Sequence, residues 1–240
     1  MLAFREGAEP LDANAVHASS PVADLHAHPG LVAHWLGRDL SRSLRPPRFG
    51  YGPIFQQLDL PGMIEGGLRL LTACAYTPTV PPFPSPFQGA QRQLDFVEAL
   101  CERAPGIAKV ARKRGEVGPA LSSAKLAIVH AAEGGHHLER SLENLEALAA
   151  RGLRYLTLTH FVHNGLAQPA KLGPFTLLRG APGLTDFDGF VWSARRMREA
   201  RHYPVLTEAL SRRGFNREEL RGILGGNYLR VLGESLPGSG

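Results

Sequence analysis

Two histidines separated by a single residue, His26 and His28, follow a short apolar segment at 21–25. Proline and glycine come directly after them, so we expect a short strand that ends there. Side chains two positions apart in a strand point to the same side, so both imidazoles could reach one metal ion. Neutral imidazole nitrogen is a common ligand for zinc. A pair of surface histidines near a turn is the alternative, and the spacing alone leaves both open.

A carboxylate follows a second apolar segment. Glu133 comes after KLAIVHA at 125–131 and before Gly134 and Gly135. Glycines allow close backbone approach or positive φ, so the chain could turn sharply there and leave Glu133 at the strand end. Glu133 could then bridge two metal ions. The alternative is a place at the start of the next helix, where a carboxylate is also favoured.

Two further candidates lie later in the chain. His160 ends a third apolar segment, LRYLTLTH at 153–160, and could be a metal ligand, a base or a substrate contact. A strand end with a hydrogen-bonded imidazole is the alternative. Asp188 belongs to the turn DFDG, which could carry chemistry or be an ordinary loop turn, because such sequences are common in turns.

The elements that position these residues alternate between strands and helices. We expect strands at 21–25, 66–76, 125–131 and 153–160, and helices at 91–114, 139–151, 205–213 and 217–224. Asn216 and Glu219 form a capping box for the last helix. This order is typical of a parallel sheet in an α/β protein. Four of the candidates lie at the carboxyl ends of their strands, where a (β/α) barrel carries its active site: His26, His28, Glu133 and His160.

Composition excludes several classes of protein. The 240 residues are 43% hydrophobic and 20% charged, unlike a disordered chain, a collagen or a coiled coil. The net charge of +5, with a pI of about 9.6, is a mild basic excess that does not by itself indicate nucleic-acid binding, so we expect no nucleic-acid partner. Cys74 and Cys101 are expected to be buried thiols in a reducing compartment. We see neither a signal sequence nor an apolar run of about 18 residues, so we expect a cytoplasmic protein without a membrane span.

Seven stretches, in order along the chain, together resemble one family, the M19 membrane (renal) dipeptidases. They are DLHAHPG at 24–30, LDLPGMIEGGLRLLTACAYTP at 58–78, AAEGGHHL at 131–138, LRYLTLTH at 153–160, DFDGF at 186–190, YPVLTEALSRRGF at 203–215 and ILGGNYLRVL at 223–232. The combination of EGGH, RYLTLTH and GGNYLRVL is specific. Residues 1–20 are polar without a clear period and the chain ends in LPGSG, so we expect flexible ends at 1–20 and 234–240. The resemblance implies a single domain over 1–240. It also implies an amidohydrolase-type (β/α) barrel, a two-zinc site and cleavage of dipeptides or related amides.

The resemblance assigns a role to each candidate. His26 and His28 match the first-strand metal ligands, although the family pattern is His-x-Asp. Glu133 matches the carboxylate that bridges both zinc ions. His160 matches a histidine that contacts substrate, and Asp188 matches an acidic residue near substrate.

One departure from the family pattern is large. Only 25 residues separate His160 from Asp186. There the family carries a long stretch with two more zinc-ligand histidines and a substrate-binding arginine. We therefore expect an incomplete barrel without several central strands. A second zinc ion would need a substitute ligand from a partner chain or from His130, His136, His163 or His202. A homodimer would cover the exposed sheet edges.

The sequence therefore predicts a zinc-dependent dipeptidase-like hydrolase that cleaves a dipeptide or small amide with a metal-activated water. A noncatalytic remnant that binds a ligand or a partner is the alternative, because the family's later zinc ligands are missing. A single-metal hydrolase of another amide or ester, which would use His26, His28 and Glu133 alone, is a third hypothesis.

Overall fold

The computed structural model describes residues 11–43, 57–80, 83, 85–123, 125–160, 164, 166 and 197–236. Within these residues five strands form one parallel sheet: β1 (Val22–Ala27), β2 (Leu68–Ala75), β3 (Ala108–Val110), β4 (Leu126–Ala132) and β5 (Leu153–Leu156). β2 lies between β1 and β4. The other edge of β4 pairs with β3 at its start and with β5 at its end. The predicted α/β architecture with a parallel sheet is confirmed.

The helices that connect and cover these strands are α1 (Ala13–Ala18), α2 (Leu31–Trp35), α4 (Leu60–Glu65), α5 (Pro86–Arg103), α6 (Arg114–Ser122), α7 (Leu142–Ala150), α8 (Tyr203–Ser211), α9 (Arg217–Arg221) and α10 (Asn227–Ser235). Short 3-10 helices, η1 (Gly135–Leu138) and η2 (Ala200–His202), and a π-helical turn, η3 (Gly222–Gly226), complete the described elements. The capping box expected at Asn216 and Glu219 begins α9.

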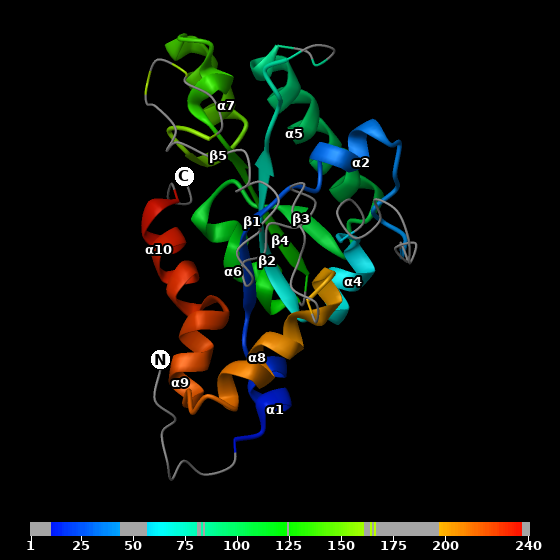
Figure 1. Cartoon of the computed structure of the whole chain (residues 1–240), viewed down its shortest axis with the longest axis vertical. Helices are drawn as coiled ribbons and strands as arrows, with labels where there is room; N and C mark the ends of the chain where they lie inside the picture. The colour runs from blue at the N-terminus through cyan, green and yellow to red at the C-terminus, as the bar shows by residue number, and fades with distance from the viewer. Residues whose placement is uncertain are drawn as a thin grey trace, which may run out of the picture.

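Helices lie on both faces of the sheet (Figure 1). On one face, Leu71 of β2 and Ile128 of β4 belong to the same core cluster as Leu100 of α5. On the other face, Val129 of β4 packs in a cluster with Leu232 of α10. Every residue of β4 is buried, as is usual for parallel strands with both faces covered.

The sheet must curve strongly, because its first and last strands approach each other. The Tyr155 hydroxyl on β5 lies 2.8 Å from the carbonyl oxygen of Leu25 on β1. β1 and β5 are separated by β2 and β4, so a flat sheet would hold them about 14 Å apart, at about 4.8 Å for each strand spacing. A tyrosine side chain is shorter than that. The curvature is the one that a partial barrel requires.

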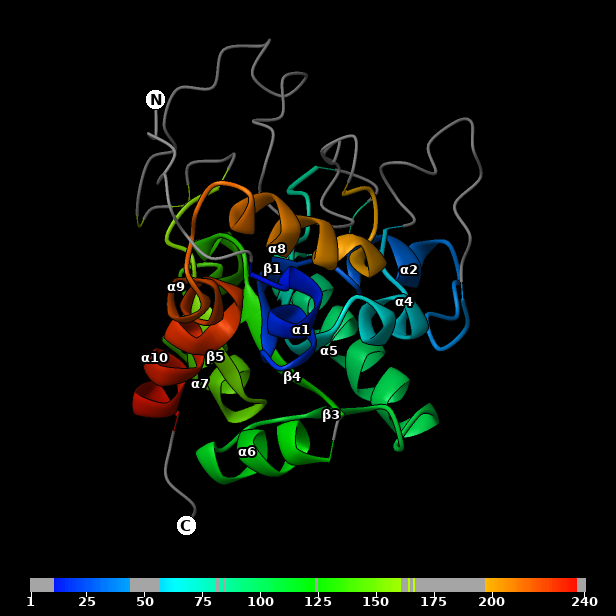
Figure 2. The same ribbon diagram turned by 90° about the horizontal axis from the view of Figure 1, so that it is seen from below.

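The first 20 residues, which we expected to be flexible, contain the packed helix α1. Asp12 caps this helix, and Val16 and His17 are buried. The His17 ring lies 2.6 Å from the Thr207 hydroxyl of α8 and 2.9 Å from the Gly66 carbonyl oxygen. Figure 2 shows α1 directly beside α8.

The prediction of one helix over 91–114 is wrong. The helix α5 begins earlier, at Pro86, and ends at Arg103. Pro105 and Gly106 follow, and proline cannot continue a helix because it lacks an amide hydrogen. The chain then forms β3 and a separate helix, α6. None of the described helices is long and apolar enough to cross a membrane.

Candidate metal centre

The carboxyl ends of β1 and β4 bring three of the predicted residues together. His26 lies in β1, His28 one residue beyond it, and Glu133 directly after β4. The Nε2 atom of His26 is 3.2 Å from Glu133 Oε1, and Nε2 of His28 is 3.4 Å from Glu133 Oε2. One ligand atom from each of the three residues lies within 4.8 Å of the other two. These atoms could therefore surround a single ion.

His160 reaches the same carboxylate from the end of β5. Its Nε2 atom lies 3.3 Å from Glu133 Oε1. Gly134 helps to position the segment that carries His160. Its φ is 100°, and its amide donates a hydrogen bond to the hydroxyl of Thr157, three residues before His160, at 2.7 Å. A side chain at Gly134 would have a Cβ 2.3 Å from His136 Nδ1, so the turn requires glycine.

The chemistry of the donors fits a metal cation. His28 Nδ1 lies 3.0 Å from the Cys74 carbonyl oxygen. A carbonyl oxygen only accepts, so Nδ1 of His28 carries the hydrogen and, in the neutral ring, Nε2 presents a lone pair to Glu133. Histidine ligands usually donate their second ring nitrogen in this way. Two imidazoles and one carboxylate form a donor set known for catalytic zinc, which keeps a further position open.

The electrostatics of the site also favour a cation. Burial of Glu133 opposes its ionisation, but the hydrogen bond from His26 and the nearby charges of His28 and His160 outweigh burial and lower the pKa of Glu133. Burial of His26 opposes its protonation, but hydrogen bonds with Cys74 and Glu133 outweigh burial and raise the pKa of His26 to about 11. The carboxylate therefore stays negative, and its surroundings favour positive charge.

The proposed substitute ligands do not join this group in the part of the chain that the structure describes. His130 is buried and lies 3.3 Å from Glu98, consistent with a core position. His136 lies 3.0 Å from the Thr77 carbonyl oxygen. His202 is paired with Glu199 at 3.9 Å. His136 and the adjacent His137 are both buried within η1. Asp188 and His163 lie outside the described residues.

Two residues that sequence reasoning missed lie behind His26. The His26 Nδ1 atom is 2.8 Å from the Tyr155 hydroxyl and 3.3 Å from Cys74 Sγ. Both cysteines of the chain are free and buried, as expected. The sequence did hold one signal for Tyr155, its place in the strand that leads to His160. A buried tyrosine hydroxyl usually has a hydrogen-bond partner, and here that partner could have been expected near the site.

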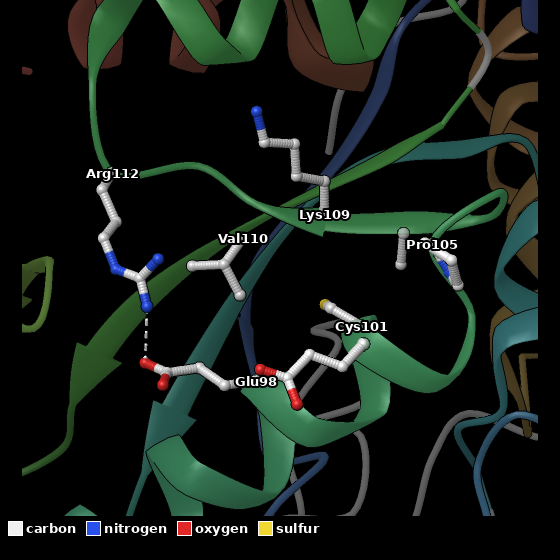
Figure 3. Close-up of a pocket in the computed structure, with 8 residues that line it drawn as sticks. Glu98, Cys101, Pro105, Lys109, Val110 and Arg112 are labelled. Atoms are coloured by element: carbon white, nitrogen blue, oxygen red, sulfur yellow. Dashed lines mark hydrogen bonds and ion pairs between the residues drawn. The ribbon is translucent and has the colours of Figure 1, made fainter.

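A hollow of about 350 Å³ lies at the other end of β4, between α5 and β3 (Figure 3). Glu98 and Arg112, which line it, form an ion pair at 2.8 Å, and Glu98 also pairs with Arg151 at 2.9 Å. In this hollow the Glu98 carboxylate is already paired with two arginines, whereas Glu133 lies beside two histidines that can bind a metal ion. We therefore place the candidate site at Glu133.

Comparison with known proteins bears on the family and the fold of the chain. The family model described as membrane dipeptidase (peptidase family M19) matches residues 11–185 and 183–236. Dipeptidase 3 of Macaca fascicularis is 32% identical over 98 residues, which are 41% of this chain and 19% of that protein. The matched part therefore spans about a fifth of this relative's length.

Two solved structures have a similar fold. One, titled dipeptidase AC, is a metallopeptidase of family M19 with a TM-score of 0.67 at 15% identity, over 91% of this chain and 99% of the other. The second is a metallopeptidase from Rhodobacter sphaeroides, liganded with a phosphinate mimic of the dipeptide L-Ala-D-Ala. Its TM-score is 0.66 at 16% identity, over 90% and 99% of the two chains. The predicted α/β fold class is confirmed, and within the described residues the parallel sheet has five strands.

Proposed function

We propose a function that proceeds from one premise: the chain belongs to the membrane dipeptidase family, peptidase family M19. The proposed activity is zinc-dependent hydrolysis of a dipeptide or a related small amide. The observation that carries it is the convergence of His26, His28 and Glu133, with ligand atoms within 4.8 Å of one another, at the carboxyl ends of the strands. Enzymes with (β/α) barrels carry their active sites at that end.

Each residue has a part in the proposed mechanism. His26, His28 and Glu133 would hold zinc, as their donor chemistry permits. When bound, zinc supplies a Lewis acid that polarises a carbonyl group and activates water near neutral pH. The lowered pKa of Glu133 keeps this ligand ionised at neutral pH. His28, with its Nδ1 hydrogen held by a backbone carbonyl, keeps a fixed orientation.

His160 is placed to act on the substrate. Its Nε2 atom lies at the same carboxylate as the ligands, and about a quarter of its side chain is exposed. We propose that it donates a hydrogen bond to the carbonyl oxygen as negative charge develops there. Asp188 is proposed, from the resemblance alone, to hold the substrate or to carry a proton.

A noncatalytic remnant is the second candidate, and one observation favours it. The described residues supply three clustered ligands, and His130, His136 and His202 lie elsewhere. A family member that needs two zinc ions would therefore be incomplete. Such a chain would bind a ligand or partner without turnover.

Metal content and hydrolysis, measured together, test the proposal. We expect protein purified without chelators or a histidine tag to carry about one zinc ion per chain and to hydrolyse dipeptides. Glu133→Gln should lose the zinc and lower kcat/KM at least 100-fold, because the amide is neutral. Removing a residue that only hydrogen-bonds to a metal ligand typically lowers metal affinity or activity about 10- to 100-fold, so removing a ligand itself should cost at least as much. The control is Glu234→Gln on α10, whose side chain is 68% exposed and remote from the cluster in sequence.

Each outcome decides between the candidates. Full activity in Glu133→Gln would rule out the hydrolase as proposed. A parent chain that takes up no zinc and shows no turnover after zinc is supplied would support the noncatalytic remnant. Zinc uptake together with hydrolysis of other amides or esters, but not of dipeptides, would support the single-metal hydrolase.

We also propose a cytoplasmic location, supported by two free, buried cysteines. Free thiols are typical of reducing compartments. Cell fractionation tests this location, and recovery in a secreted fraction would contradict it.

A further inference from the structure

The hydroxyl of Tyr155 lies between two strands, directly behind a candidate metal ligand. It is 2.8 Å from the Leu25 carbonyl oxygen and 2.8 Å from His26 Nδ1. It is also 2.8 Å from Cys74 Sγ. The Tyr155 and His26 rings are stacked, with centroids 6.3 Å apart and an interplanar angle of 23°.

Counting protons at this hydroxyl fixes the direction of each hydrogen bond. A phenol has one hydrogen to donate, and a carbonyl oxygen can only accept. The hydrogen of Tyr155 must therefore lie on the path to Leu25. The phenol oxygen is then an acceptor toward His26, so the Nδ1 atom of His26 must carry a hydrogen. Cys74 donates its thiol hydrogen to the remaining lone pair of the same oxygen.

This protonation determines what His26 presents to the cluster. Without a metal ion, Nε2 of His26 also carries a hydrogen and donates it to Glu133 Oε1 at 3.2 Å. A metal ion would replace that hydrogen, and the ring with hydrogen on Nδ1 would then offer its Nε2 lone pair to the ion. The same tautomer follows for His28, whose Nδ1 hydrogen is held by the Cys74 carbonyl oxygen. With a cation between the rings and the carboxylate, the Nε2 lone pairs of both rings would face that cation.

We propose that Tyr155 is the positioning residue of this centre: its hydroxyl holds the Nδ1 hydrogen of His26 and so presents Nε2 to the metal ion. The proposal rests on the proposed function for the identity of that ion, zinc. Tyr155 touches neither the ion nor the substrate and acts through His26. The hydroxyl links β5 to β1 across 130 positions of the sequence, so it also sets the distance between these strand ends.

Zinc affinity, rather than hydrolysis, tests the proposal. We expect Tyr155→Phe to bind zinc about 10- to 100-fold more weakly than the parent, in competition with a chromophoric chelator. The matched control is Tyr228→Phe on α10. It loses one hydroxyl hydrogen bond, to Thr72 of β2 at 2.7 Å, without touching His26. The parent and this control should have the same zinc dissociation constant.

A second measurement separates positioning from a merely structural role. In the zinc-loaded parent, the Nδ1 hydrogen of His26 should give a resolved NMR signal protected from exchange with water. Tyr155→Phe should lose that protection, whereas Tyr228→Phe should keep it. Thermal unfolding of the metal-free proteins reports how much each substitution affects the fold.

The inference fails if Tyr155→Phe binds zinc within about twofold of the parent, or if both variants weaken binding equally. Neither result would affect the proposed function, which depends on zinc binding and hydrolysis by the parent. Conversely, a parent that binds zinc but cleaves no dipeptide would overturn the proposed function and leave the role of Tyr155 intact.

Discussion

At the scale of single residues, one carboxylate organises the candidate site. Glu133 lies within 3.4 Å of imidazole nitrogens from His26, His28 and His160. The first two belong to the ligand cluster, whereas the ligand atoms of His160 do not complete that group. We infer that the histidines divide into two that hold the ion and one that faces the substrate.

This division predicts the behaviour of His160→Ala. The variant should keep the parent's zinc content and lower kcat about 100- to 1,000-fold, the usual cost of losing one hydrogen-bond donor to a developing oxyanion. KM should change much less, because that interaction forms chiefly in the transition state. Steady-state kinetics and metal analysis of the same preparation check both quantities.

The control for that experiment is His34→Ala, which removes an exposed imidazole of α2. Its kinetics should match the parent's. If His160→Ala instead loses its zinc, His160 is a ligand and the division is wrong.

Sequence reasoning reached part of this site, for a physical reason. His26 and His28 lie at the end of β1 and Glu133 directly follows β4, and parallel strands place their carboxyl ends at one edge of a sheet. Tyr155 was missed because its partner His26 is 129 positions away, and no local pattern specifies that contact.

At the scale of elements, the sequence predicts the long apolar strands and the longer helices. It does not predict the helices that contain or follow glycine and proline. β2 and β4 are long apolar runs bounded by loops. α6 contains Pro119 and two glycines, which hide its helical period. α10 follows a kink at Gly225, whose φ of 173° and ψ of −18° are not helical, so the chain breaks close to the predicted helix end at 224. Close packing explains Gly225, because its Cβ would lie 2.1 Å from the Pro21 carbonyl oxygen.

Glu98 of α5 fixes this helix to the elements that carry the site. Its carboxylate pairs with Arg112 at 2.8 Å, with Arg151 at 2.9 Å and with His130 of β4 at 3.3 Å (Figure 3 shows the first pair). Burial of Glu98 opposes its ionisation, but the charges and hydrogen bonds of Arg151 and Arg112 outweigh burial and lower its pKa from 4.5. The folded state therefore holds the ionised form more tightly than the unfolded state does.

This linkage predicts how Glu98→Gln depends on pH. A lowered folded-state pKa contributes stability above the unfolded value, and this stability is lost as the pH falls through the folded value. At pH 7 the variant should unfold with a free energy about 1–3 kcal/mol below the parent's, because charged hydrogen bonds are lost. Below pH 4.5 this difference should shrink. Urea unfolding at several pH values measures it.

Glu102→Gln, on the same helix and beside the same hollow, serves as the control. Its stability should stay within about 0.5 kcal/mol of the parent's at every pH. A Glu98→Gln deficit that stays constant down to pH 3 would contradict the linkage.

At the scale of the whole molecule, the two ends of the described sheet differ. Beside β1, η3 and α10 pack closely on the strand. Beside β5, by contrast, Leu142, Leu158 and Leu166 are 71%, 64% and 57% exposed. Leu142 and Leu166 line a hollow of about 360 Å³. Monomeric proteins rarely leave contiguous apolar surface uncovered.

We therefore propose that a second copy of the chain covers the β5 end. Within the described residues β5 pairs only with β4, so its other edge could also pair with a copy of itself.

Sedimentation equilibrium should give twice the 26.0 kDa mass of the chain at micromolar concentrations. Leu142→Glu should shift the protein to a monomer, because it would bury a charge at the interface. Val231→Glu, at a 48% exposed position of α10, should leave the dimer intact. A parent that sediments as a monomer across this range would show that the apolar β5 end does not bind a second copy.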